Sequence, residues 1–281
     1  MISGSLLIDK EIGLTSRQEV NNISRLLGEK KAGHIGTLDP FADGLLIVLL
    51  GKATKISPFL EGMDKTYLTT LKLGEQTDTG DLTGNLVSKS DIPSLDKTFI
   101  ENVFNSFLGK QKQLPPMYSA IKINGKQLYK YARAGEEIER KKREINIHEL
   151  KLLTFDKNTI TFIAKVSKGT YIRTLGEDIA KKLGTCGHLT KLTRLAIGPY
   201  SLEKAKKSKD VKVSDLISSL DMLSFMPSYE VDEEFARKAL NGMHFRLPIK
   251  DELVLLKDKE DVIAIYKREH SGVYSCVRGL R

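Results

Sequence analysis

A short segment near the amino terminus gathers side chains that can do chemistry. Between residues 30 and 45, Lys30, Lys31, His34 and Asp39 lie among three glycines. Glycine lets a backbone come close to a ligand, and lysine and histidine can hold phosphate groups. Pro40 restricts Asp39 to extended or turn geometry, so its carboxylate is presented in a fixed direction. Asp39 is therefore a candidate nucleophile, base or electrostatic stabiliser.

A purely structural interpretation competes with this one. Asp-Pro is a common turn dipeptide, and His34 can be a loop histidine whose hydrogen bonds are satisfied locally. On residue chemistry alone, the turn is the favoured interpretation of Asp39 and Pro40.

The elements that position this segment are visible in the hydrophobic pattern. Residues 6–8 read as a strand, and Thr15-Ser16 offers an N-cap for a helix that stops at Gly28. We expect a basic, glycine-rich loop over residues 30–44, a buried strand over 45–50 and an alternating strand over 66–73. Loops held by such a rigid scaffold often carry function.

The rest of the chain mixes helices and strands without strict alternation. Helices are expected over residues 99–108, 171–183 and 211–223, and paired strands over 145–153 and 159–166. Short β-like runs follow Pro227. The fold class is therefore α+β. We place one domain over residues 1–225 and a small β-rich domain over 226–281.

Composition narrows the partners. The 281 residues carry a net charge of +9 and a pI of about 9.3, which favours a polyanionic partner although many basic proteins bind none. The two cysteines are far apart and form no CxxC pattern, so we expect no metal site and a reducing compartment. The longest apolar run is far too short to span a membrane, which indicates a cytoplasmic protein.

Several ordered segments resemble one family. Residues 33–45 resemble the catalytic motif of the TruB family, the pseudouridine synthases that modify the T-loop of tRNA. Similar blocks follow in order at residues 65–67, 73–81, 113–122, 167–175 and 192–195. One departure is Glu11, where the family usually has a proline nearby, and the likeness of the last fifty residues to a PUA domain is loose.

The resemblance implies a fold and a reaction. The expected fold is a mixed, mainly antiparallel sheet followed by a PUA-like domain. The expected reaction isomerises uridine to pseudouridine at position 55 of tRNA. It breaks the N1–C1′ bond, turns the base and joins C5 to C1′, so neither a redox cofactor nor a metal is expected.

The resemblance also assigns roles to residues. Asp39 is the catalytic carboxylate, and Arg173 is its partner, which we expect to lower the pKa of Asp39 and to hold it in a bidentate pair. Tyr67 stacks on the flipped uracil and helps to move a proton at C5. Tyr171 and Leu192 line the same pocket. Taken alone, Tyr67 and Leu192 would be ordinary core residues.

RNA binding is the last expectation. The target base must be extruded from a folded loop, and His34 is placed to fill the gap or to contact the neighbouring phosphate. The candidates for RNA-backbone contacts are Lys30, Lys31, Lys122, Lys126, Lys130 and Arg133. We expect a monomer that binds the T-arm of tRNA and reaches the acceptor stem through its carboxy-terminal domain.

Two other functions stay open at this point. The chain could be an RNA-binding or RNA-folding module without catalysis, or a phosphate-transferring enzyme with Asp39 as nucleophile. The second needs nucleotide and magnesium, and the sequence has no P-loop pattern.

Overall fold

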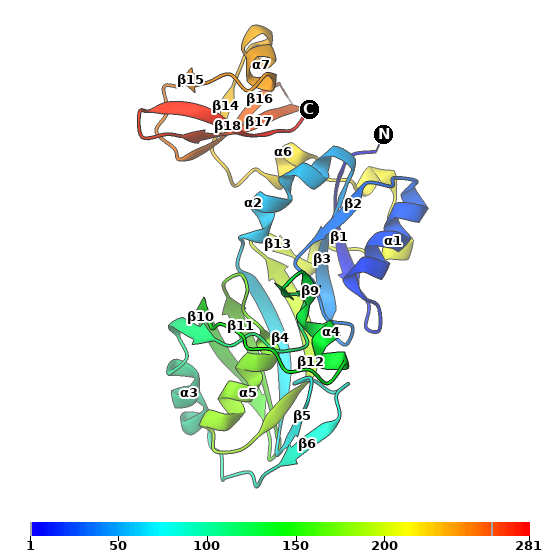
Figure 1. Cartoon of the computed structure of the whole chain (residues 1–281), viewed down its shortest axis with the longest axis vertical. Coiled ribbons are helices and arrows are strands. Elements are labelled where there is room, and N and C mark those ends of the chain that lie inside the picture. Colours follow the sequence, from blue (N-terminus) through cyan, green and yellow to red (C-terminus); the bar gives the residue numbers. More distant parts are fainter. Residues whose placement is uncertain (1, 260) are drawn as a thin grey trace.

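The main sheet forms the frame of the molecule (Figure 1). The computed structural model describes residues 2–259 and 261–281, in which this sheet has nine strands. Along its main path lie β1 (Gly4–Lys10), β3 (Asp43–Leu50), β12 (Gly187–Ile197), β4 (Lys65–Leu73), β11 (Thr159–Val166), β10 (Arg143–Phe155) and β7 (Gly109–Gln113). Two short strands join it, β2 (Ala32–Ile35) on β3 and β13 (Tyr200–Ser201) on β12. Only the β3–β12 pair is parallel among the described strands of this sheet, so the α+β prediction with a mainly antiparallel sheet is confirmed.

Helices cover the sheet where its strands present apolar side chains. Strand β4 alternates buried and half-buried residues along its whole length, as a strand with one face on a core must. Helices α3 (Lys97–Asn105) and α5 (Ile172–Lys182) close this core, to which α5 contributes Leu175 and Ile179. The core thereby fixes the start of α5, where Arg173 lies.

The amino-terminal helix α1 (Ser16–Leu27) follows the predicted pattern. Thr15 caps it by accepting a hydrogen bond from the Gln18 amide, and Gly28 ends it in the left-handed conformation. Val20 and Ile23 pack on β1 and β3.

The remaining elements are short. They comprise α2 (Ser57–Glu61), α4 (Leu128–Arg133), α6 (Ser219–Met222), the hairpin strands β5 (Glu75–Thr77) with β6 (Leu86–Lys89) and β8 (Lys122–Ile123) with β9 (Lys126–Gln127), and 3₁₀ helices at Gly51–Ile56, Leu202–Lys204, Ser208–Asp210 and Val213–Asp215. The single helix predicted over residues 211–223 is therefore wrong. That stretch crosses the sheet edge, where Ile217 pairs with Ser5, and main-chain bonding to β1 replaces the helical bonds.

The carboxy-terminal residues build a second sheet, seen at the top of Figure 1. Its strand order is β14 (Ser228–Glu230), β16 (Leu253–Asp258), β17 (Asp261–Arg268), β18 (Val273–Gly279) and β15 (Phe245–Arg246). Helix α7 (Glu233–Leu240) packs on it. Val262 and Leu280 of this part share an apolar cluster with Met222 and Leu223, so the two sheets are joined by a packed interface.

Among the described helices, none is both long and apolar enough to cross a membrane.

Candidate active site

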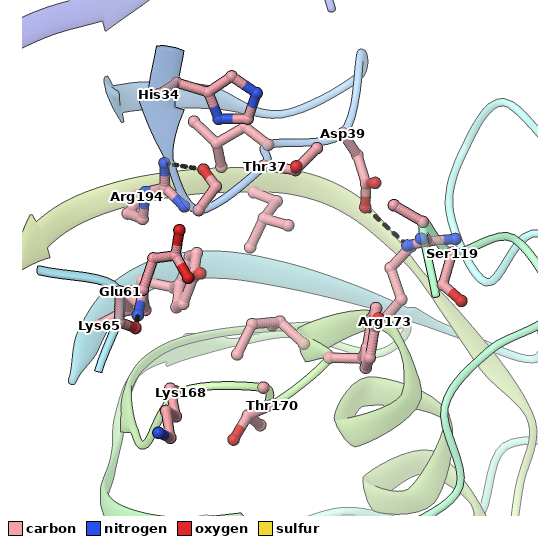
Figure 2. Close-up of a pocket in the computed structure, with 18 residues that line it drawn as sticks. His34, Thr37, Asp39, Glu61, Lys65, Ser119, Lys168, Thr170, Arg173 and Arg194 are labelled. Atoms are coloured by element: carbon pink, nitrogen blue, oxygen red, sulfur yellow. Dashed lines mark hydrogen bonds and ion pairs between the residues drawn. The ribbon is translucent and has the colours of Figure 1, made fainter. Parts of the chain in front are cut away.

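A cavity of about 460 Å³ lies where the Asp39 loop, β4, β12 and the start of α5 meet (Figure 2). Its volume is in the range of small-molecule and cofactor pockets. The residues around it are His34, Gly36, Thr37, Leu38, Asp39, Glu61, Lys65, Tyr67, Ser119, Ala120, Lys168, Gly169, Thr170, Tyr171, Ile172, Arg173, Leu192 and Arg194. All six residues predicted to act in catalysis or to bind the substrate therefore border this one cavity: His34, Asp39, Tyr67, Tyr171, Arg173 and Leu192.

The loop that carries Asp39 is anchored by the start of α1. The Ser16 hydroxyl donates to the Leu38 carbonyl at 3.1 Å, and the Leu38 amide donates to the same hydroxyl at 2.8 Å. The Gly13 amide donates to the Pro40 carbonyl at 2.7 Å. Main-chain bonds on both sides of Asp39 therefore fix where its carboxylate points.

Arg173 holds that carboxylate. Its Nε lies 2.8 Å from Oδ2 of Asp39, and the arginine side chain is only 4% exposed. Its two terminal nitrogens donate to the main-chain carbonyls of Thr79 at 2.6 Å and Tyr118 at 2.7 Å. The pair therefore runs through Nε, in place of the expected bidentate contact, because the terminal nitrogens are used to anchor the guanidinium.

A second carboxylate lies behind the arginine. Oδ2 of the buried Asp81 is 3.6 Å from a terminal nitrogen of Arg173. Oδ1 of Asp81 accepts from the Thr79 hydroxyl at 3.0 Å and from the Thr83 amide at 2.9 Å. Asp81 thus braces the turn whose Thr79 carbonyl holds the guanidinium.

The environment of Asp39 acts on its ionisation in two directions. Burial raises the pKa of Asp39 above its ordinary value, and the Arg173 guanidinium opposes that rise. Arg173 lowers the pKa of Asp39, as expected, but burial has the larger effect and the net pKa is raised. The Asp39 side chain as a whole is still 34% exposed.

Arg194 ties together the two ends of the Asp39 loop. It is 1% exposed, and its Nε donates to the Leu45 carbonyl at 2.7 Å while Nη2 donates to the Gly36 carbonyl at 2.9 Å. Gly36 has a φ of +64°, and a β-carbon there would lie 3.2 Å from Nη1 of Arg194. Glycine at this position satisfies both the turn and the close approach.

Three further residues form walls of the cavity against which a flat ring could lie. Tyr67 and Leu192 are nearly buried on the neighbouring strands β4 and β12, and Tyr171 is the residue that precedes α5. Burial raises the pKa of Tyr171, so its phenol stays protonated. Two aromatic rings and one aliphatic side chain therefore border the cavity that Asp39 enters.

His34 lies on a strand, which corrects the prediction of an uninterrupted loop over residues 30–44. Strand β2 pairs with β3, and His34 stands opposite Val48. Burial, followed by the charge of Arg194, lowers the pKa of His34. Its Nδ1 is buried and has no hydrogen-bond partner among the described residues.

Residues 24–172 match the family model for the amino-terminal domain of the TruB family pseudouridylate synthases. The chain belongs to the TruB family. A tRNA pseudouridine synthase B from Hydrogenovibrio crunogenus is 49% identical over 86% of this chain and 80% of its own length. One from Geobacillus thermodenitrificans is 40% identical over 94% of both chains.

Solved structures share the fold of this TruB family member. A Cbf5-Nop10-Gar1 complex aligns with a TM-score of 0.73 and 24% identity over 94% of this chain and 78% of that one. An archaeal box H/ACA Nop10-Cbf5 complex aligns with a TM-score of 0.73 and 20% identity over 99% and 86%. The predicted pseudouridine synthase fold is confirmed.

The six candidates for RNA-backbone contacts lie outside the cavity of this TruB family member. Lys122, Lys126, Lys130 and Arg133 cluster on the β8–β9 hairpin and α4, whereas Lys30 and Lys31 lie between α1 and β2. Lys126 sits 4.1 Å from the Tyr131 ring centre and pairs with Glu136 at 3.7 Å. Lys122 and Lys126 lie on the paired strands of the hairpin, and α4 with Lys130 and Arg133 follows directly in the chain.

Sequence reasoning missed Asp81, Arg194 and Lys65. Asp81 and Arg194 lie in the family-like blocks 73–81 and 192–195, but neither was assigned a role. Lys65 is buried, and its Nζ donates to the carbonyls of Glu61 at 3.0 Å and Met63 at 2.6 Å. Lys65 precedes Tyr67 on the buried face of β4, so its place in the block 65–67 and the alternation of this strand are the signals that point to it.

Proposed function

We propose that this chain is a tRNA pseudouridine synthase that isomerises uridine to pseudouridine at position 55 in the T-loop. The observation that carries the proposal is the ion pair between Asp39 and Arg173 inside a cavity bordered by Tyr67, Tyr171 and Leu192. Family membership and relatives named tRNA pseudouridine synthase B support it.

Asp39 assists the break of the N1–C1′ bond. It acts either by nucleophilic attack or by stabilising positive charge that develops on the sugar. Both roles need the carboxylate in its ionised form. Arg173 favours that form against burial and holds Oδ2 in place.

The walls of the cavity hold the detached base while it turns. Tyr67 stacks on the uracil and helps to move the proton from C5, and Leu192 and Tyr171 confine the ring. After C5 joins C1′, the proton lost from C5 is balanced by one gained at N1. The reaction is an isomerisation without any net redox change.

Extrusion of the uridine requires contacts outside the cavity. His34 fills the space that the extruded uridine leaves in the T-loop, or contacts the neighbouring phosphate. The basic hairpin around Lys122 and Lys130 contacts the RNA backbone. We assign residues 226–281 to a PUA-like domain that contacts the acceptor stem. The enzyme works as a monomer in the cytoplasm, where its two unpaired cysteines stay reduced.

The test is incubation of the purified protein with an unmodified tRNA transcript, followed by mapping of pseudouridine. No cofactor is added. We expect one new pseudouridine at position 55. A transcript that remains unmodified, or one modified outside the T-loop, would refute the proposal.

A further inference from the structure

The end of the cavity away from Asp39 gathers positive charge. Figure 2 shows Lys65, Arg194 and Lys168 on one side of the pocket, together with the carboxylate of Glu61, and Asp39 and Arg173 on the other. The three cations come from β4, β12 and the turn before α5, so only the folded chain brings them together.

None of these three cations forms an ion pair within the described residues. Lys65 and Arg194 are buried, and their hydrogen bonds run to uncharged main-chain carbonyls. Glu61 borders the same side of the cavity, but it is exposed and forms no ion pair with these cations, while Asp64 pairs with His148. Three cations beside one exposed carboxylate leave an excess of positive charge, and unpaired buried charge is unfavourable, so this arrangement indicates a site that an anion completes.

Donors remain for such an anion. A lysine ammonium has three N–H groups, and Lys65 uses two of them. Nη1 of Arg194 makes no hydrogen bond to any described residue and lies beside Gly36 at the cavity wall. Lys168 is exposed at the rim, where it can approach a ligand without a change in the fold.

The ionisation of Lys65 reflects its buried position beside another cation. Burial and the charge of Arg194 lower the pKa of Lys65 to about 8. A bound anion would favour the charged ammonium and oppose that shift.

We propose that Lys65, Arg194 and Lys168 form an anion subsite that binds a phosphate group of the RNA backbone next to the target uridine. The inference rests on the proposed function, because the phosphate belongs to the substrate. A nucleotide anchored at this end places its sugar between the phosphate and Asp39. The subsite would therefore set the distance from the sugar to the carboxylate.

The experiment measures RNA affinity in full-length protein carrying Asp39→Asn, so that turnover does not interfere. The probes are three synthetic T-arm hairpins. One has ordinary linkages, one has a neutral methylphosphonate on the 5′ side of the target uridine, and one has it on the 3′ side. The affinity for each hairpin is measured with three proteins. One carries Asp39→Asn alone, one carries Lys168→Gln in addition, and one carries Lys65→Gln in addition. Lys165→Gln is the matched control, since that exposed lysine on β11 does not border the cavity.

We expect one of the two neutral linkages to weaken binding about tenfold, as loss of a charged hydrogen bond does. In the proteins with Lys168→Gln or Lys65→Gln, we expect the affinity for the ordinary hairpin to fall by a similar factor. The neutral linkage then causes no further loss of affinity. Lys165→Gln keeps full sensitivity to the linkage.

Two results would overturn the subsite. One is a neutral linkage that weakens binding equally in all variants, and the other is that neither linkage matters. If inorganic phosphate competes with RNA while neither linkage matters, the cluster binds a free ion and the assignment to RNA is wrong. Because affinity is read without turnover, these outcomes are independent of whether the wild-type protein makes pseudouridine.

Discussion

Asp39 is held by the one nitrogen of Arg173 that the rest of the protein leaves available. Nε contacts Oδ2 at 2.8 Å, while Nη1 and Nη2 are anchored on the carbonyls of Thr79 and Tyr118. The guanidinium is therefore a fixed charge, and the Asp39 side chain, which borders the cavity, is still a third exposed. This geometry suits a carboxylate that must stay ionised and still reach a substrate.

The pH dependence of turnover tests the electrostatic balance at Asp39. The ionised form is required, so activity is lost as the pH falls through the pKa of Asp39, which burial has raised. Arg173→Gln removes the opposing charge, so the acid limb of the single-turnover rate moves to higher pH. An acid limb at the same pH as in the wild type would show that Arg173 does not control the ionisation.

Asp81→Asn tests whether Asp81 is needed to hold Arg173 in place. The amide removes a negative charge 3.6 Å from the guanidinium and weakens the turn that carries Thr79. We expect the single-turnover rate to fall about tenfold with tRNA affinity unchanged, since the loss is that of one charge-assisted contact. Asp78→Asn is the control, because Asp78 bonds Asn85 in the same turn without contacting Arg173. Equal effects in both variants would contradict the role of Asp81.

Arg194→Met tests whether the ends of the Asp39 loop need to be joined. The change removes the bonds to Gly36 and Leu45, each between a charged donor and a carbonyl. We expect the free energy of unfolding in urea to fall by about 2–4 kcal/mol and the rate to fall with it. Turnover as fast as that of the wild type would show that the loop holds Asp39 without Arg194.

Removal of residues 226–281 tests the carboxy-terminal domain. We expect weaker tRNA binding with slow catalysis retained, measured by titration and by product formation. The cut also uncovers Met222 and Leu223, so the melting temperature should fall, and affinity must be compared below the new melting point. Unchanged affinity there would show that this part does not bind RNA.

Local patterns in the sequence predicted much of the frame. Thr15 and Gly28 bounded α1, and alternation placed β4, since capping and two-residue periodicity depend on neighbours in the chain. The strand at His34 and the extended course near Ile217 were missed, because both depend on pairing with a distant strand.

The candidate site was predictable where motif residues carry it. Asp39, Tyr67, Arg173 and Leu192 border one cavity. The partners of Arg173 and Arg194 could not be predicted, because they are main-chain carbonyls brought close by tertiary folding. The rise in the pKa of Asp39 was missed for a similar reason, since burial is a property of the folded chain.

The most direct test compares the wild type with Asp39→Asn on an unmodified tRNA transcript, with binding and pseudouridine formation measured on the same samples. The amide keeps the size of the carboxylate and removes its charge. We expect tRNA affinity to stay within about twofold, since Asp39 acts on the reacting uridine, and no pseudouridine to form at position 55. Measurable product from Asp39→Asn would contradict the account.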